Sequence, residues 1–323
     1  MKILRSLLFL LTLALGRAED IRIGIVGLDG SHCIQFAKLL QEKDNPEQVA
    51  GARIVAAFKG GSRDVESSAQ RVEGFARDLA ANYGVKLCDT IEEVVAQSDA
   101  IMILSVDGRT HLEQARRVFP AGKPVFVDKP VAASTRDAIA LFKLAEESHA
   151  PCFTASSFRF GPGMATVKSA AIGHQQGAFA YGSARTEPHH PDLFWYGIHT
   201  VEALYEVMGP GCKTVVRTYT PDADIVTGVW ADGRTGTIRG NRNTTSQAGL
   251  MVFGSKGIVE KPPGNSYAPL LREIVKFFQT RIAPVPHAES IEVLAFMEAA
   301  DVSKQRGGQP VALEQVMTSA MTR

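Results

Sequence analysis

The sequence lacks several features that would assign it to a class at once. Lys and Arg total 35 against 34 Asp and Glu, and no excess of one charge favours nucleic acid or an anionic membrane as a partner. Its cysteines form no CxxC or Cys/His pattern typical of zinc, and we expect buried free thiols at Cys33, Cys88, Cys152 and Cys212. It also lacks internal repeats and low-complexity tracts. With 45% hydrophobic residues, the chain has the composition of a globular protein, for which a small-molecule ligand is the default.

The chain has no apolar run long enough to cross a bilayer comfortably; the run at Leu7–Leu15 is short. It follows Lys2 and Arg5 and precedes small residues ending at Ala18, the pattern of a secretory signal peptide. A buried first helix is the alternative, but no cap or amphipathic stripe separates this run from the next strand. We therefore expect a signal peptide over residues 1–18, a secreted or periplasmic location, and no membrane span after cleavage.

From residue 19 to 155, short β-rich apolar runs alternate with helical stretches. The predicted strands are Ile21–Val26, Arg53–Phe58, Ala100–Val106, Pro124–Val127 and Pro151–Thr154; the predicted helices are His32–Lys43, Ser67–Tyr83, Ile91–Gln97, Thr110–Phe119 and Thr135–Ser148. Strands separated by helices imply right-handed crossovers and a doubly wound parallel sheet, the Rossmann arrangement. In such sheets ligands bind beyond the C-terminal ends of the strands.

From residue 156 to 323, the pattern changes to strands joined by Gly and Asp turns. We predict strands at Ala178–Thr186, Lys213–Tyr219, Ile225–Trp230, Thr235–Arg239 and Gly249–Phe253, and helices at Leu270–Thr280 and Ser290–Lys304. This pattern predicts an open, mostly antiparallel sheet with helices on one face. The fold class is therefore α/β, with an N-terminal Rossmann domain and a C-terminal α+β domain.

The loop after the first strand reads Gly27-Leu28-Asp29-Gly30-Ser31-His32 and leads into a helix. A glycine turn before a helix N-terminus favours anions such as phosphate. A dinucleotide fingerprint that starts at Gly27 would have glycine at positions 29 and 32, where this chain has Asp29 and His32. Gly30 could restore some flexibility, while Asp29 or Ser31 could equally be an ordinary helix cap. The loop leaves both interpretations open.

The turn after the second strand contains cations where an acid would be typical of NAD binding. It reads Lys59-Gly60-Gly61-Ser62-Arg63. Lys59, Ser62 and Arg63 suit a 2′-phosphate, which favours NADP over NAD. A solvated basic turn is the alternative.

Two later segments are more specific. Ser105-Val106-Asp107-Gly108-Arg109-Thr110-His111 is similar to T-P-N-x-x-x-H, and the segment 122–130, ending in Asp128-Lys129-Pro130, is similar to A-G-K-x-V-x-x-E-K-P. Residues 197–202 are similar to G-x-H-x-x-D, and residues 252–257 and 299–311 continue the likeness. The chain resembles the family of glucose–fructose oxidoreductase, inositol dehydrogenase and MocA (Gfo/Idh/MocA) over nearly all its length after residue 18.

The resemblance implies a Rossmann domain that binds NAD or NADP, a second domain whose sheet often forms dimers, and oxidation of a sugar or polyol hydroxyl. By this match Lys129 and His199 are the catalytic candidates, with Tyr196 as a further proton carrier. Loss of hydride from a carbinol requires removal of the hydroxyl proton, which such groups can accept. The cofactor candidates are Gly27, Asp29, Gly30, Ser31, His32, Lys59, Ser62, Arg63, Ser105, Asp107, His111, Asp128, Lys129 and Pro130.

One departure concerns the position four residues before His199. Family dehydrogenases typically carry Asp there, and this chain has Trp195, which cannot accept a proton but can stack on a sugar face. Nearby side chains that could replace the lost acid are Asp192, His189, His190 and Tyr196. Possible metal ligands in this region are His189, His190, Asp192, His199 and Glu202, but their spacing fits no zinc template and we expect no metal.

Three functions follow from these observations. The first is an exported NAD(P)-dependent oxidoreductase acting on a carbohydrate-like substrate, as the resemblance implies. Because free cofactor is scarce outside the cytoplasm, the cofactor would be tightly retained. The second is a redox-neutral glycosidase with retained cofactor. The third is a carbohydrate-binding member without catalysis, in line with the departures at Asp29, His32 and Trp195. We expect a homo-oligomer in each case.

Overall fold

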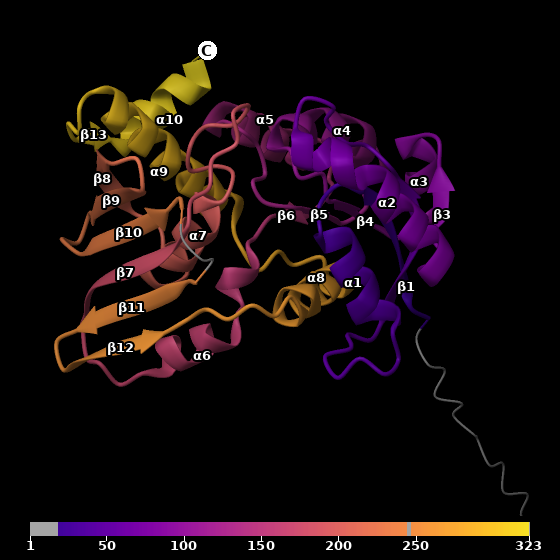
Figure 1. Ribbon diagram of the computed structural model, residues 1–323, viewed down its shortest axis with the longest axis horizontal. Helices are drawn as coiled ribbons and strands as arrows, with labels where there is room; N and C mark the ends of the chain where they lie inside the picture. The colour runs from indigo at the N-terminus through magenta and orange to yellow at the C-terminus, as the bar shows by residue number, and fades with distance from the viewer. Residues whose placement is uncertain (1–18, 244–246, 323) are drawn as a thin grey trace, which may run out of the picture.

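The structure is a computed structural model that describes residues 19–243 and 247–322. The predicted signal peptide lies outside the described residues. Two sheets stand side by side, with helices between and around them (Figure 1). Among the described helices, none is both long and apolar enough to span a membrane.

The N-terminal sheet is fully parallel, in the order β3-β2-β1-β4-β5-β6. Its strands are β1 (Ile21–Val26), β2 (Ala52–Phe58), β3 (Lys86–Cys88), β4 (Ala100–Ile103), β5 (Val125–Val127) and β6 (Cys152–Phe153). Its helices are α1 (His32–Gln41), α2 (Glu66–Tyr83), α3 (Ile91–Gln97), α4 (His111–Val118) and α5 (Thr135–Glu147), with short 3₁₀ turns at Gly108–Thr110 and Phe119–Ala121. The strand order reverses between β1 and β4, which is where such sheets bind ligands.

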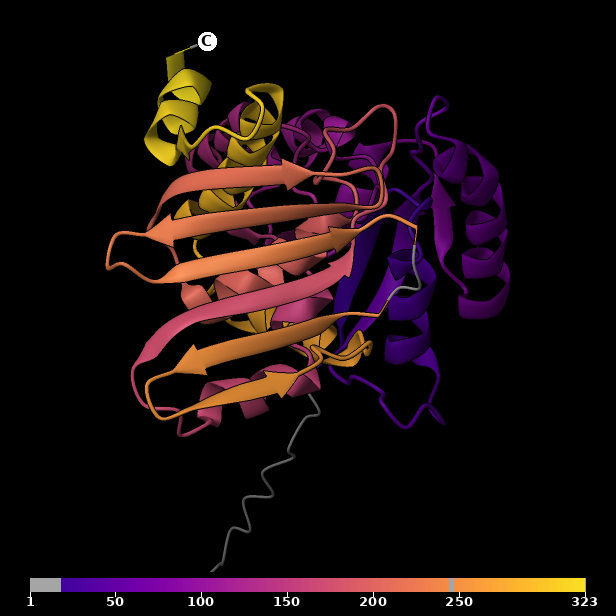
Figure 2. The ribbon, with the colours of Figure 1, turned by 60° about the vertical axis from the view of Figure 1, so that its left-hand side comes forward.

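The C-terminal sheet is mixed and mostly antiparallel, in the order β12-β11-β7-β10-β9-β8-β13, with β7 and β10 parallel. Its strands are β7 (Gln175–Ser183), β8 (Cys212–Tyr219), β9 (Ala223–Trp230), β10 (Thr235–Asn241), β11 (Gly249–Gly254), β12 (Gly257–Lys261) and β13 (Val311–Ala312). The remaining helices are a 3₁₀ turn (Ser157–Arg159), α6 (Pro162–Ser169), α7 (Gly197–Met208), α8 (Ala268–Thr280), α9 (His287–Gln305) and α10 (Leu313–Thr322). One broad face of this sheet stands open (Figure 2). The predicted fold class is confirmed.

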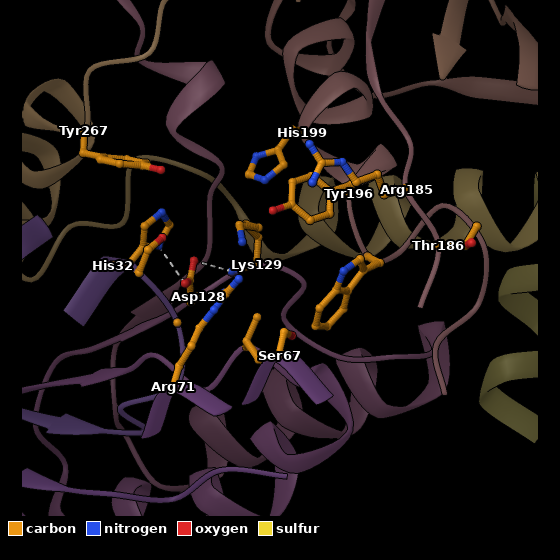
Figure 3. Close-up of a pocket in the computed structure, with 14 residues that line it drawn as sticks. His32, Ser67, Arg71, Asp128, Lys129, Arg185, Thr186, Tyr196, His199 and Tyr267 are labelled. Carbon is orange, nitrogen blue, oxygen red and sulfur yellow. Dashed lines mark hydrogen bonds and ion pairs between the residues drawn. The ribbon is translucent and has the colours of Figure 1, made fainter. Parts of the chain in front are cut away.

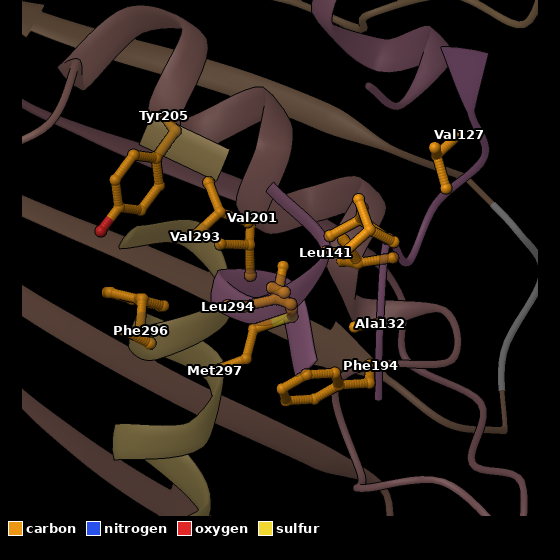
Figure 4. Packing of buried hydrophobic residues seen from close by; sticks show 14 of the residues in the cluster. Val127, Ala132, Leu141, Phe194, Val201, Tyr205, Val293, Leu294, Phe296 and Met297 are labelled. Atoms are coloured by element: carbon orange, nitrogen blue, oxygen red, sulfur yellow. The ribbon is translucent and has the colours of Figure 1, made fainter. Parts of the chain in front are cut away.

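A continuous apolar core joins the two sheets. Val127 of β5 and Leu141 of α5 belong to the same buried cluster as Val201 of α7 and Leu294 and Met297 of α9 (Figure 4). Because buried contacts run across the junction, the end of β5 and the start of α7 are held at a fixed separation.

Helix α8 belongs to the C-terminal part of the chain but packs beside α1 of the Rossmann domain (Figure 1). Phe277 of α8 meets Phe153 of β6 edge to face, with ring centroids 4.9 Å apart. Tyr267, just before α8, meets His32 in the same way at 4.8 Å. The sequence boundary at residues 155 and 156 stays a prediction, but in space the returning α8 brings Tyr267 to the first loop.

Candidate active site

A cavity of about 260 Å³ lies between the domains, beyond the C-terminal ends of β1 and β5 (Figure 3). Rossmann-domain residues that line it are Gly30, Ser31, His32, Ser67, Arg71, Val106, Asp128 and Lys129; later residues are Arg185, Thr186, Trp195, Tyr196, His199 and Tyr267. A second cavity of about 190 Å³ shares Tyr196, His199 and Tyr267 and adds Ser157, Phe158, Ser183 and Asn265. The two together form one polar cleft.

Asp128 organises the floor of the cavity. One of its oxygens lies 2.7 Å from Nδ1 of His32, and the other accepts a hydrogen bond from the backbone N–H of Lys129 at 2.7 Å. Burial alone would raise the pKa of Asp128, but His32 and Lys129 hold this pKa below its usual range. The carboxylate is therefore ionised and fixes the backbone that carries Lys129.

His199 lies in the first turn of α7 and faces the cavity from the other domain. Its Nδ1 shares a 2.7 Å hydrogen bond with the hydroxyl of Ser156. Burial, together with the positive charges of Lys129 and His32, lowers the pKa of His199 well below its ordinary value. We conclude that His199 is neutral at physiological pH, so one of its ring nitrogens carries a proton and the other can accept a hydrogen bond.

This state of His199 makes stability depend on pH. In the unfolded chain the ring would bind a proton below its ordinary pKa of 6.5, whereas the folded ring binds one only at lower pH. The contribution of His199 to the free energy of unfolding is therefore fully present above pH 6.5. It is lost as the pH falls below this value, by up to about 1.4 kcal/mol per pH unit. Denaturant melts from about pH 8 to about pH 5 should show a smaller loss for His199→Asn than for the wild type. An identical loss in both proteins would contradict the assignment.

The residues around Trp195 do not replace the missing family acid. Asp192 pairs with Arg217 at 2.8 Å and Lys304 at 2.5 Å and does not line the cavity. His189 and His190 both contact Glu187. Tyr196 and Trp195 themselves line the cavity, and Arg185 lies over the ring of Tyr196, 5.5 Å from its centroid. Of the replacements considered, only Tyr196 reaches the site.

On the other side of the first loop, a buried hydrogen-bond network joins three loops at the edge of the sheet. Asp29 accepts hydrogen bonds from the hydroxyl of Ser68 at 2.6 Å and from the backbone N–H of Val106 at 3.1 Å. The Ser68 hydroxyl in turn accepts one from the backbone N–H of Ser62 at 2.7 Å. Burial raises the pKa of Asp29. The carboxylate is therefore committed to contacts within the chain.

The network continues from Ser62 to the loop after β4. The Ser62 hydroxyl donates to Asp107 at 2.5 Å, and Asp107 also accepts from the guanidinium of Arg109 at 2.7 Å. Nε2 of His190 lies 3.0 Å from the same carboxylate. The loops also touch through their backbones, since a Cβ added at Gly60 would lie 3.2 Å from Cα of Gly27.

These contacts show which parts of a dinucleotide the loops of the Rossmann domain can accommodate. Its nicotinamide end fits beside Gly30, Ser31, Asp128 and Lys129, which line the cavity at the start of α1. For an adenine ring to lie between the loops after β2 and β4, the atoms of the two loops on either side of the ring would have to be about 7 Å apart. This separation is the sum of two van der Waals contacts of about 3.5 Å each. Ser62 and Asp107 are joined directly at 2.5 Å. The described residues therefore do not fit the adenosine end unless these two loops separate.

Other predicted cofactor residues also have partners within the chain. Lys59 pairs with Glu73 at 3.0 Å, and the Ser105 hydroxyl accepts from Gln114 at 2.8 Å. The ring nitrogens of His111 contact the carbonyls of Ser105 and Val131. Arg63 is exposed, and neither it nor Gly27 nor Pro130 lines the cavity. Predicted residues that do line it are Gly30, Ser31, His32, Asp128, Lys129, Tyr196 and His199.

Sequence reasoning missed Ser67, Arg71, Arg185, Thr186 and Tyr267 as site residues. Ser67 and Arg71 are one turn apart on α2, and only the packing of that helix against the first loop reveals their role. Among the described residues, no group of three or more His, Cys, Asp or Glu is arranged to hold a metal ion. All four cysteines are buried free thiols, as predicted.

A six-stranded Rossmann domain joined to a mixed-sheet domain, with a polar cavity between them, defines a class of nucleotide-binding oxidoreductase folds. Residues 21–156 match the model of the Gfo/Idh/MocA family, described as an oxidoreductase family with an NAD-binding Rossmann fold. The N-terminal domain therefore belongs to this family, and the resemblance inferred from the motifs is confirmed.

Curated relatives and solved structures agree with this assignment. The chain is 33% identical to 4-carboxy-2-hydroxymuconate-6-semialdehyde dehydrogenase of Sphingobium sp. over 37% of this chain and 35% of that protein. It is 33% identical to inositol 2-dehydrogenase of Gluconacetobacter diazotrophicus over 29% of this chain and 26% of that protein. The matches thus span about a third or less of each relative. Myo-inositol dehydrogenase from Lactobacillus casei, solved with NAD(H) and myo-inositol, has the same fold, with a TM-score of 0.72, 14% identity and coverage of 91% of this chain and 97% of that one.

Proposed function

We propose that this chain is an NAD(P)-dependent oxidoreductase that acts on a hydroxyl or carbonyl group of a small carbohydrate derivative. One observation carries the proposal: Lys129 from the Rossmann domain and His199 from the second domain line the same cavity. The dehydrogenase names of the relatives and the NAD-binding family description support it. The finer expectations of an NADP preference, a retained cofactor, export and a homo-oligomer remain part of this proposal.

The chain's own residues account for the acid–base part of such a reaction. A bound nicotinamide would supply the hydride acceptor. Lys129, whose backbone is fixed by Asp128, would take the proton of the substrate hydroxyl when its amine is in the neutral form. His199, neutral and hydrogen-bonded to Ser156, would pass on that proton without keeping it, and the phenol of Tyr196 would bind a neighbouring hydroxyl. The ring of Trp195 offers an apolar face to a sugar.

The test is a turnover assay with purified protein. Neutral polyols, aldoses and sugar acids would be supplied with NAD or NADP, and nicotinamide reduction followed by absorbance. We expect reduction with at least one of these substrates. Binding of a ligand without any nicotinamide reduction, by a protein that has been shown to bind the cofactor, would contradict the proposal.

A second candidate function, ligand binding without turnover, is favoured by the network between Asp29 and Asp107. In this case the loops stay joined and the chain needs no dinucleotide. Binding of a carbohydrate derivative by calorimetry, with no measurable affinity for NAD or NADP, would support this candidate over the first.

Opening the network should tell the two candidates apart. Ser62→Ala removes the bond to Asp107, and Asp29→Gly removes the carboxylate and restores the fingerprint glycine. Loss of these contacts should let the loops separate, so we expect the double variant to bind NADH about tenfold more tightly than the wild type. NADH fluorescence titration measures this, with Ser169→Ala on exposed α6 as the matched control. Unchanged affinity in the double variant would show that the network does not restrict the cofactor.

A further inference from the structure

We infer that the cavity takes a negatively charged ligand: a small polyhydroxylated molecule that carries a carboxylate or a phosphate. This inference rests on the proposed function, because it names the substrate class of the same site. It is carried by the charges that line the cavity.

Three cationic side chains line the cavity against a single carboxylate. The cations are Arg71, Arg185 and Lys129, and the carboxylate is Asp128. Among the ion pairs of residues 19–243 and 247–322, none involves any of these three cations. Asp128 is already engaged by His32 and by the backbone of Lys129. A neutral ligand would leave Arg71 and Arg185 without an anionic partner.

The cations come from both domains, so an acidic ligand would draw on both. Arg71 projects from α2 towards Asp128 and Lys129, and Arg185 lies beside Tyr196 on the opposite side (Figure 3). Arg185 follows β7 closely and is placed by its contact with the Tyr196 ring, 5.5 Å from the centroid. An arginine pairs with a carboxylate or phosphate through charge-assisted hydrogen bonds, about twice as strong as neutral ones.

The surroundings add to the positive potential and do not cancel it. His199 contributes no negative charge to the cavity. The cavity also meets the start of α1 at Ser31 and His32, where the helix dipole favours an anion. Side-chain hydroxyls of Ser31, Ser67, Thr186 and Tyr196 line the cavity as partners for the ligand's own hydroxyls.

The experiment compares probes that differ in charge. Gluconate supplies a carboxylate, glycerophosphate a phosphate, myo-inositol and glucose neither, and inorganic phosphate the anion alone. Trp195 lines the cavity and is one of two tryptophans, so intrinsic fluorescence reports occupancy and calorimetry confirms it. We expect gluconate or glycerophosphate to bind about tenfold or more tightly than the neutral probes. The stronger of the two identifies the anionic group.

Variants locate the charge effect. Arg71→Met and Arg185→Met should each weaken binding of the anionic probe by about tenfold and weaken binding of myo-inositol much less. Arg77→Met is the matched control, because Arg77 is exposed on the same helix and does not line the cavity. Circular dichroism melts establish that each variant is folded. Both arginines are at the surface, so we expect little change in Tm.

Three results would overturn the inference: neutral probes that bind as tightly as anionic ones, anion binding that neither arginine variant weakens, or inorganic phosphate binding without gluconate or glycerophosphate. Failure of the inference is distinguishable from failure of the proposed function. Oxidation of a neutral polyol with no anion preference overturns the inference and keeps the function. Anion binding that depends on the arginines, without any oxidation, keeps the inference and overturns the proposed function.

Discussion

Replacing Lys129 by methionine is expected to lower turnover by about 10²–10⁴-fold while Tm stays nearly unchanged. Methionine keeps an apolar stem of similar length after β5 but removes the amine that would take the substrate proton. Lys129 forms no side-chain hydrogen bond or ion pair within the described residues that the fold would lose. His199→Asn should show a smaller loss, because Tyr196 lines the same cavity and can relay the proton in its place.

The assay for this prediction uses the substrate that the turnover panel identifies, with kcat and KM measured separately. Lys213→Met is the matched control, since Lys213 is exposed on β8 of the C-terminal sheet and does not line the cavity. A near-normal kcat in Lys129→Met would contradict the assignment of Lys129 as the proton acceptor. A large fall in Tm would instead show that Lys129 has a structural role.

Replacing Arg159 by methionine is expected to destabilise the fold by about 3–5 kcal/mol. Arg159 is 2% exposed and pairs with Glu202 and with Glu206 and Glu289, at 3.1 and 2.5 Å for the last two. Removal of its charge leaves Glu202 buried without a cationic partner, and that desolvation cost is the reason for the size of the effect. Because Glu202 lies on α7, one turn after His199, the ion pair also positions the helix that carries His199.

Urea melts of Arg159→Met, Lys168→Met and the double variant Arg159→Met with Glu202→Gln test this prediction. Lys168 pairs with Glu206 at 2.7 Å but is 56% exposed, so its loss should cost no more than about 1 kcal/mol. The Glu202→Gln change should recover part of the loss, because it neutralises the stranded carboxylate. Equal stability for Arg159→Met and Lys168→Met would contradict this account of the cluster.

Much of the fold followed from hydrophobic patterning. Alternation of buried strands with helices predicted the parallel sheet, and the ends of β1, β2 and β5 agree with the predicted ends at Val26, Phe58 and Val127. Strand β3 was not predicted, because it has only three residues and two of them, Lys86 and Leu87, are exposed. Helix α7 was not predicted because it is buried on nearly all sides, so its sequence has no clear amphipathic period.

The site was predictable where it depends on strand ends and not where it depends on how loops meet. Lys129 and Asp128 directly follow β5, so the rule for parallel sheets placed them at the cavity. Ser62 and Asp107 were assigned to the cofactor from their loops, but they bond each other. A sequence does not reveal whether two facing loops hold a ligand or hold one another. Arg71 and Arg185 come from a helix and a strand end whose approach across the cleft is set by packing alone.

We propose that Lys129 and His199 act on a ligand hydroxyl in the cavity between the domains. A crystal structure of the protein with the tightest-binding probe tests it most directly. We predict a ligand hydroxyl within hydrogen-bond distance of Lys129 Nζ and near His199, a neighbouring hydroxyl near Tyr196, and the acidic group of the ligand facing Arg71 or Arg185. A ligand held instead in the separate pocket lined by Tyr181, Glu260 and Asn265, with the cavity at Lys129 left free, would contradict the claim.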